Sequence, residues 1–235
     1  MLKILLSLRT TIVLLLALIL LFLYGSAVMP LKPEFKLLYT EPLLPWMKAF
    51  PVGLTWWLWA SFGVAALLTA NTIVCSIESL VRKREARQWL LIISPQIVHL
   101  GFLFILLAHL MSSYGSLKAT AIAYQGSMLR LSGDSAVVFQ NLRADFDRTG
   151  YVRDWSADVA FVKNNVIVRT DTIAPNKPSF IDGLGIYIQT VRPDVMPVAM
   201  VEVSKEPGAV WALIGAVFFL VGMTALLVLK IRRET

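Results

Sequence analysis

The only two histidines of the chain, His99 and His109, lie in one apolar stretch, QIVHLGFLFILLAHL at 96–110. A neutral imidazole can ligate haem iron, form a hydrogen bond or relay a proton. Polar groups are costly within a bilayer, so those kept there normally face other helices and serve a purpose. Ten residues separate the two rings, about 15 Å along a helix and roughly 80° around it, so they cannot ligate one iron together.

Two roles for His99 stay open from the residues alone. It lies about nine residues into its apolar stretch, roughly 14 Å deep and thus near the middle of a bilayer. There it is either an axial haem ligand or an interhelical hydrogen-bonding group, paired with Asn71 or a backbone carbonyl. A proton relay is disfavoured because no Asp or Glu lies within any predicted span. His109 lies near the outer surface, where we expect an interfacial residue and only a weak candidate haem ligand.

Other residues able to do chemistry are few, and no catalytic residue is predicted. Cys75 is the only cysteine, and the chain has no C-x-x-C or C-x-x-C-H motif. The chain is therefore predicted to be neither a thiol oxidoreductase nor itself a c-type cytochrome. We expect Cys75 to be a small packing residue. Because one helix carries both histidines, a membrane haem would take its second ligand from water, another residue type or another chain.

The composition indicates a membrane protein, with 57% hydrophobic and only 16% charged residues. Four apolar stretches reach the length of about 20 residues that a bilayer requires. They are 10–30, 53–77, 90–112 and 209–229. The first also resembles a signal peptide, but we expect it to be retained as an anchor and first span. The predicted division is three helices in 1–112, one domain in 113–207, and a fourth helix with its tail in 208–235.

Basic residues predict the orientation of these spans. Nine of them flank the predicted inner ends of the spans, against only three acidic residues, Glu78, Glu85 and Glu234. They are Lys3, Arg9, Arg82, Lys83, Arg84, Arg87, Lys230, Arg232 and Arg233. By the positive-inside rule both termini and the 78–89 loop are cytoplasmic, and the neutral segment 113–207 is extracytoplasmic. The formal net charge of +7 thus reflects topology, and no nucleic acid is predicted as a partner.

The segment 113–207 is predicted to be a β-rich domain inserted between the third and fourth helices. Four β-rich runs are separated by Gly, Pro and Asn turns: 116–133, 158–172, 183–191 and 198–205. Such short strands favour a sandwich or a partly open barrel. Alternation in GIYIQTV predicts that Tyr187 lies in the core, together with Phe146. The tryptophan-rich TWWLWASFG at 55–63 is interpreted as an aromatic belt at the membrane surface.

Several short motifs follow one another in a specific order. The spans contain LLSLRTTIVLLLALIL at 5–20, NTIVCSIESLVRK at 71–83 and HLGFLFILLAHL at 99–110, which holds His99 and Gly101. The strand start YGSLKATAIAYQGSMLRL at 114–131 holds Gly126. The domain adds Asp145, Phe146, Gly150, Trp155, Ser156, Asn176, Pro178, Gly183, Tyr187 and Gln189. Together these motifs resemble the ResB family, also called CcsB, of System II cytochrome c biogenesis.

The resemblance implies a haem-handling subunit that works with a ResC- or CcsA-like membrane protein. The pair moves haem outward and presents it for covalent attachment to apocytochrome c, with the thiol chemistry mainly in the partner. It implies haem b as cofactor, with His99 as one axial ligand and a histidine of the partner opposite. It also implies a bacterial inner membrane or a plastid thylakoid membrane. The alternative is a structural anchor of a redox or transport assembly that binds no haem, which the optical absorption of the purified complex distinguishes.

Overall fold

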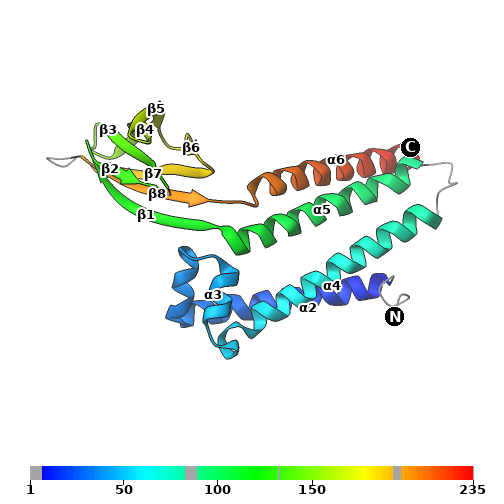
Figure 1. Ribbon diagram of the computed structural model, residues 1–235. Helices are drawn as coiled ribbons and strands as arrows, with labels where there is room; N and C mark the ends of the chain where they lie inside the picture. The colour runs from blue at the N-terminus through cyan, green and yellow to red at the C-terminus, as the bar shows by residue number, and fades with distance from the viewer. Residues whose placement is uncertain (1–6, 83–88, 132, 193–196, 235) are drawn as a thin grey trace. The chain divides into compact units, whose positions relative to one another are not determined.

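The computed structural model describes residues 7–82, 89–131, 133–192 and 197–234 (Figure 1). The chain divides into two compact units. Met1–Tyr114 and Pro207–Thr235 form a helical unit, and Gly115–Glu206 form a unit of strands. The basic residues Lys83, Arg84 and Arg87, on which the predicted orientation partly depends, lie outside the described residues, as do Lys3 and Glu85.

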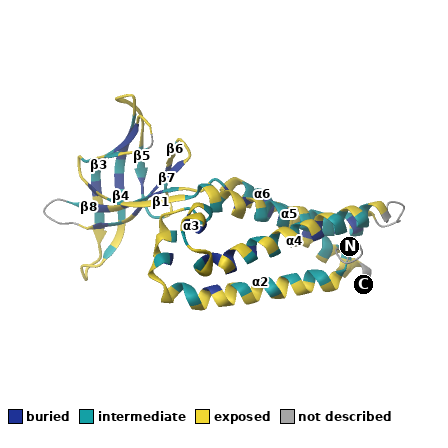
Figure 2. Ribbon diagram, turned by 60° about the horizontal axis from the view of Figure 1, so that its bottom comes forward, coloured by how far each residue is buried: buried dark blue, intermediate teal, exposed yellow. Residues whose placement is uncertain are grey.

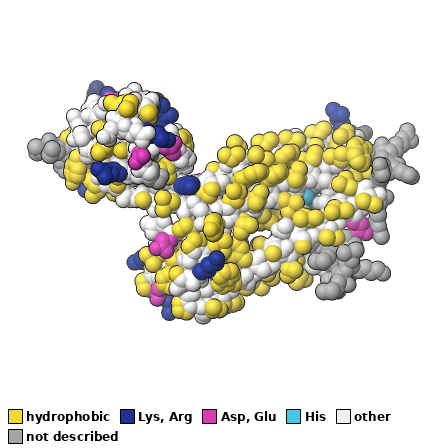
Figure 3. All heavy atoms as spheres, in the orientation of Figure 1, with side chains coloured by type: hydrophobic (Ala, Val, Ile, Leu, Met, Phe, Trp, Pro, Cys, Tyr) yellow, Lys and Arg dark blue, Asp and Glu magenta, His cyan; other side chains and the backbone are white. Residues whose placement is uncertain are grey.

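Among the described residues, four helices are long and apolar enough to cross a membrane: α2 (Leu8–Val28), α4 (Val52–Arg82), α5 (Trp89–Gly115) and α6 (Ala209–Glu234). Most of their apolar side chains are exposed (Figure 2). On the face shown in Figure 3, hydrophobic side chains cover the helices, and charged ones gather toward their two ends. Such a surface is stable only against lipid or another apolar partner. The prediction of a multi-pass membrane protein is therefore confirmed.

Helices α2 and α4 are joined by contacts near both ends. At one end, the hydroxyl of Thr11 donates to the Oδ1 atom of Asn71 at 2.8 Å, and Asn71 is 2% exposed. At the other end, the ring of Trp57 fills the space where a side chain on Gly25 would lie. Because a polar atom in lipid must be satisfied within the protein, the Thr11–Asn71 bond helps fix the register of the two helices.

Helices α5 and α6 approach closely along a row of glycines. Gly208 lies just before α6, and Gly215 and Gly222 lie within it. Because the three are spaced seven residues apart, they lie on the same face of the helix. A Cβ atom at each would meet the backbone of α5, including the carbonyl oxygens of Ala108, Gly101 and Ser94 respectively. Small residues permit this backbone contact, which is the usual way that membrane helices associate.

The segment between α2 and α4 folds into a small helical lobe that the sequence did not predict. It contains the 3-10 helices η1 (Met29–Leu31) and η2 (Pro33–Tyr39) and the helix α3 (Leu43–Ala49). Its core consists of Phe35, Trp46, Met47, Trp57 and Leu58. The aromatic-belt interpretation is thus wrong for Trp57, which is 4% exposed, whereas Trp56 and Trp59 are exposed as a belt requires.

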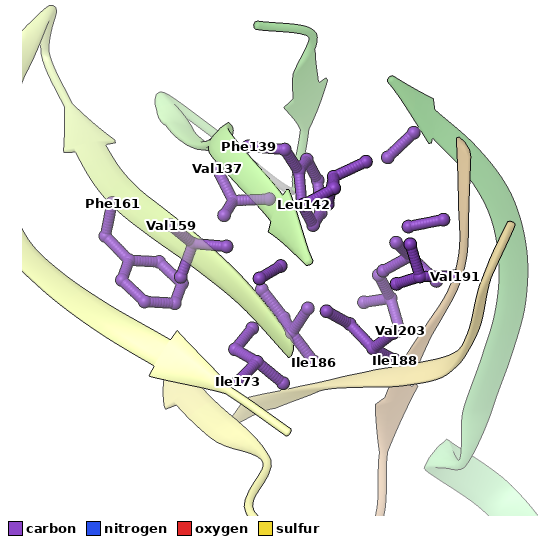
Figure 4. Close-up of a cluster of buried hydrophobic side chains, with 14 of the residues drawn as sticks. Val137, Phe139, Leu142, Val159, Phe161, Ile173, Ile186, Ile188, Val191 and Val203 are labelled. Carbon is purple, nitrogen blue, oxygen red and sulfur yellow. The ribbon is translucent and has the colours of Figure 1, made fainter. Parts of the chain in front are cut away.

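In the second unit, the described residues form eight strands in two antiparallel sheets, with the orders β1-β8-β7-β6 and β2-β3-β4-β5. The strands are β1 (Leu117–Tyr124), β2 (Met128–Arg130), β3 (Ser135–Phe146), β4 (Val152–Lys163), β5 (Val166–Ile173), β6 (Ser179–Ile181), β7 (Leu184–Arg192) and β8 (Val198–Lys205). Both sheets contribute to one core, drawn in Figure 4. The prediction of a β-rich part is confirmed, and its form is a small sandwich.

The core itself differs from the prediction at two aromatic residues. Phe146 is 46% exposed, because the pairing of β3 with β4 shifts between Asp145 and Phe146 and breaks the alternation there. Tyr187 is only half-buried. Its neighbours Ile186 and Ile188 point into the core (Figure 4), so the residue between them lies on the outer face of the sheet.

Turn residues of the predicted kind separate the strands. Asn164 and Asn165 adopt left-handed φ angles of 51° and 62° between β4 and β5, and these let the two strands form a hairpin. Gly126, at φ 83°, lies at the corner where β1 leaves one sheet and β2 joins the other. Strand β3 is hydrogen-bonded to this corner: the N–H of Phe139 donates to the carbonyl of Ser127 at 2.9 Å. One side of the sandwich is thereby closed.

Candidate haem-ligand site in the helical unit

The site is built around His99 of α5 and Ser76 of α4. The Nδ1 atom of His99 lies 2.9 Å from the hydroxyl oxygen of Ser76, a hydrogen-bonding distance. The imidazole is partly exposed, so it is held at one nitrogen by the neighbouring helix and still reaches the surface of the helical unit. The sequence had suggested Asn71 or a backbone carbonyl as the hydrogen-bond partner, whereas the structure pairs His99 with Ser76.

Helix α5 is fixed on both sides at the level of His99. Gly101 follows two residues later, roughly 200° around the helix, and it is buried against the backbone of α6. His99 thus contacts α4 while Gly101 contacts α6. Pro95 supplies no N–H to the carbonyl four residues earlier, and the hydroxyl of Ser94 donates to the neighbouring carbonyl of Leu90 at 2.7 Å.

Counting along α4 and along α5 gives different depths for the contact between His99 and Ser76. Ser76 lies six residues before Arg82, where α4 ends, a rise of about 9 Å. Glu78, the first charged residue of α4, is only two residues from Ser76. The estimate of roughly 14 Å counted only from the start of the third span. The hydrogen bond to Ser76 therefore places the imidazole in the half of the helices nearer the basic 83–88 segment.

The surroundings of His99 combine apolar surface with one unsatisfied polar atom. Ile73 and Ile77, on either side of Ser76 along α4, are 41% and 57% exposed. Gln96 precedes His99 by three residues on α5, and its side-chain Oε1 atom is buried without a hydrogen-bond partner among the described residues. A buried acceptor of this kind is normally satisfied by water or by a group from another molecule.

The second histidine lies apart from the first. His109 is exposed, and it stands ten residues further along α5, a rise of about 15 Å. Cys75, next to Ser76, is partly buried and in no disulfide. In the part of the chain that the structure describes, no group of three or more His, Cys, Asp or Glu residues is placed to hold a metal ion.

These residues fit one half of a haem site. Haem iron takes an axial imidazole through a single nitrogen, and an apolar helix surface suits the porphyrin. His99 offers a ring whose Nδ1 is already paired, and the exposed isoleucines offer apolar surface. The described residues bring no second imidazole to this point, so a second ligand would come from elsewhere.

Sequence reasoning did not identify Ser76 or Gln96. No sequence signal indicated Ser76, because Ser76 is seven residues before position 83 whereas His99 is eleven residues after position 88. Pairing residues at equal distances from the connection between α4 and α5 would therefore have misplaced the partner of His99 by about one helical turn. The contact follows from the register of the two helices.

In the strand unit, the residues that resemble the ResB motifs stabilise strands and turns. The indole N–H of Trp155 donates to the carbonyl of Ile188 at 3.2 Å and so links the two sheets. Gln189 donates to Glu202 at 2.7 Å. Gly150 and Gly183 occupy turns with positive φ angles of 86° and 78°. These contacts and turns give each of the four residues a role in folding, and none of them forms a catalytic arrangement.

Arg169 of β5 is a charged group of the strand unit with several partners. Its guanidinium donates to the hydroxyl of Ser179 at 2.7 Å and to the carbonyl of Phe180 at 2.8 Å. It also lies over the ring of Phe161, 4.8 Å from the centroid. Ser179 in turn donates to Asp171 at 2.6 Å. The hydroxyl of Ser179 is the main cause that lowers the pKa of Asp171, and the cluster ties β5 to β6.

Comparison with known proteins gives a structural likeness but no match in sequence. No family model matches the chain, and no curated protein matches its sequence. Among solved structures, the chain is similar to one described as "Cytochrome c Heme Lyase CcmF", with a TM-score of 0.46 and 18% sequence identity. The likeness covers 94% of this chain and 35% of that one, so this chain spans about a third of the length of that protein.

Proposed function

We propose that this chain is a haem-handling membrane subunit of a System II, ResB-type cytochrome c synthetase complex. In this role it helps to move haem outward and to present it for covalent attachment to apocytochrome c. The observation that carries the proposal is the imidazole of His99, held within apolar helices by Ser76 at Nδ1. The ordered motifs that resemble the ResB family support it, with His99 on the family's histidine position.

The division of labour follows from what this chain offers. His99 would supply one ligand of the haem iron as a neutral imidazole, and the apolar faces of α4 and α5 would keep water from its surroundings. A ResC- or CcsA-like partner supplies the second ligand and most of the thiol chemistry. When bound, haem b supplies an iron that accepts the imidazole nitrogen as a ligand. The strand unit is proposed to lie on the outer side of a bacterial inner membrane or a thylakoid membrane, where apocytochrome c is met.

A structural anchor without haem remains the second candidate, and one observation favours it. The hydrogen bond between His99 and Ser76 by itself gives the imidazole a partner. Interhelical hydrogen bonds of this kind contribute only about 0.6 kcal/mol on average in membranes. An imidazole retained for this purpose alone would therefore stabilise the helices only slightly, which is why we place haem ligation first.

The test is the haem content of the purified complex with its partner subunit. His99→Ala should lower the haem content and disturb the Soret band, and added imidazole should partly restore both because it fills the vacated axial position. His109→Ala is the matched control on the same helix, and its complex should retain haem. If the His99→Ala complex assembles with unchanged haem content and spectrum, the anchor function replaces the proposed one.

A further inference from the structure

We propose that Ser76 is a positioning residue for haem, whose hydroxyl oxygen accepts a hydrogen bond from the Nδ1–H of His99 and so leaves Nε2 as the ligating nitrogen. This inference rests on the proposed ligation of haem by His99. It adds to that proposal a residue of a second helix, a tautomer and the identity of the ligating atom.

The tautomer follows from the capacity of each group. A neutral imidazole carries one N–H, so the nitrogen that donates leaves the other with a free lone pair. If Nδ1 donates to Ser76, Nε2 can bind iron; if Ser76 donates to Nδ1, the proton lies on Nε2 and blocks ligation. The hydrogen bond of 2.9 Å permits either direction, so the tautomer depends on where the hydroxyl proton of Ser76 goes.

Ligation itself would set that direction. Because Nδ1 lies against Ser76, iron would reach the ring at Nε2, and the one proton of the neutral imidazole would then lie on Nδ1. Four other hydroxyl groups on α4 and α5 donate to the backbone carbonyl four residues earlier: Thr55, Ser61, Thr69 and Ser94. Ser76 is not among them; its hydroxyl oxygen lies 2.9 Å from Nδ1 and has lone pairs that can accept the N–H.

This hydrogen bond would act on the iron through the ring. A metal-bound imidazole whose second nitrogen donates to an oxygen is held in one orientation and is a more basic ligand. A more basic ligand favours ferric over ferrous haem, so loss of the bond should raise the reduction potential. Loss of such a partner typically weakens metal binding about 10- to 100-fold. Because Ser76 and His99 lie on different helices, the bond also fixes the ring relative to both α4 and α5.

The experiment compares four variants of the intact complex with its partner subunit: Ser76→Ala, Ser76→Thr, Ser94→Ala and His99→Ala. Two quantities are measured, the rate of haem loss to excess apomyoglobin and the reduction potential of the haem that remains. Ser76→Ala should lose haem about 10- to 100-fold more readily and show a higher potential. Ser76→Thr keeps the hydroxyl and should restore both values. Ser94→Ala, which removes a hydroxyl bonded within its own helix, should behave as the unsubstituted complex.

The outcomes separate this inference from the proposed function. If Ser76→Ala changes neither quantity while His99→Ala loses haem, Ser76 does not position the ligand and the proposed function stands. Faster haem loss with an unchanged potential and no restoration by threonine would show a packing defect, which also overturns the inference. If His99→Ala retains its haem as well, the proposed function and this inference fail together.

Discussion

Gly101 of α5 and Gly215 of α6 face each other with no side chain between them. A Cβ atom on Gly101 would lie 2.7 Å from the carbonyl oxygen of Gly215, and a Cβ atom on Gly215 would lie 2.7 Å from the carbonyl oxygen of Gly101. The clash is with backbone on both sides, so a rotating side chain cannot relieve it. This contact lies two residues from His99, and the position of α5 near the candidate ligand therefore depends on it.

We expect Gly101→Leu to separate α5 from α6 and to lower the free energy of unfolding by about 1–3 kcal/mol, the usual range for overpacking. Thermal unfolding in detergent measures the change. Gly63→Leu on α4 is the matched control, because a Cβ atom there meets nothing within 4 Å. Equal melting temperatures for the two variants would contradict the close approach of α5 and α6.

The strand unit offers a second test, in its core. Phe139 of β3 is 0% exposed and belongs to the core shared by the two sheets. Phe139→Ala should lower the free energy of unfolding by about 3–5 kcal/mol, the range for a buried phenylalanine. Phe146→Ala, at an exposed position of the same strand, should change it by about 0.5 kcal/mol or less. Urea unfolding of Gly115–Glu206, expressed alone and shown to be strand-rich by circular dichroism, compares them; a reversed order would refute the assignment of the core.

How far the sequence predicts this structure depends on the length of the pattern being used. Apolar stretches of more than 20 residues identified all four long helices, because lipid imposes both composition and length. The Asn164–Asn165 turn was also predictable, since few residue types accept left-handed φ angles. Phe146 was misplaced because a single β-bulge reverses which face a residue occupies, and alternation alone does not show where bulges fall.

The lobe around Trp46 and the contact of Ser76 with His99 show a different kind of limit. Trp46 is fully buried in a lobe whose elements η2 and α3 have only seven residues each, too few to show a period. Ser76 is one of several small polar residues near the end of α4, and its role depends on the register of α4 against α5. Both features follow from tertiary packing, so they become visible only once the elements are placed.

Acid should weaken the tie between β5 and β6. The Ser179 hydroxyl is the main cause that lowers the pKa of Asp171, and the Thr172 N–H and the charges of Arg169 and Lys177 also lower it against the effect of burial. A carboxylate whose pKa falls on folding stabilises the folded state at pH values above its pKa in the unfolded chain, about 3.9. That contribution is lost as the pH falls through the lowered folded value.

Ser179→Ala should therefore destabilise the strand unit at pH 6 by more than it does at pH 2.5, which lies below the unfolded pKa of the carboxyl group. Chemical unfolding at the two pH values measures the difference. Ser127→Ala is the control, because its hydroxyl oxygen accepts from the backbone N–H of Tyr124 and touches no carboxylate. A destabilisation by Ser179→Ala that does not vary with pH would mean that Asp171 titrates normally.

The orientation in the membrane is the remaining prediction, and it rests on the basic residues. With both termini and the 83–88 segment cytoplasmic, the strand unit, including Asn164, lies on the outer side. The probe is a cysteine at Val166, which is 63% exposed at the start of β5, because the left-handed backbone of Asn164 itself would strain a cysteine.

In a Cys75→Ala background, Val166→Cys should react with a membrane-impermeant maleimide in intact cells or right-side-out vesicles. Arg84→Cys should react only after the membrane is opened, since three basic residues near it hold that segment inside. Both results follow from the same charge asymmetry, so they must reverse together if the asymmetry has been misinterpreted. Labelling of Val166→Cys only after permeabilisation would place the strand unit in the cytoplasm, away from the outer side where the proposed attachment of haem to apocytochrome c takes place.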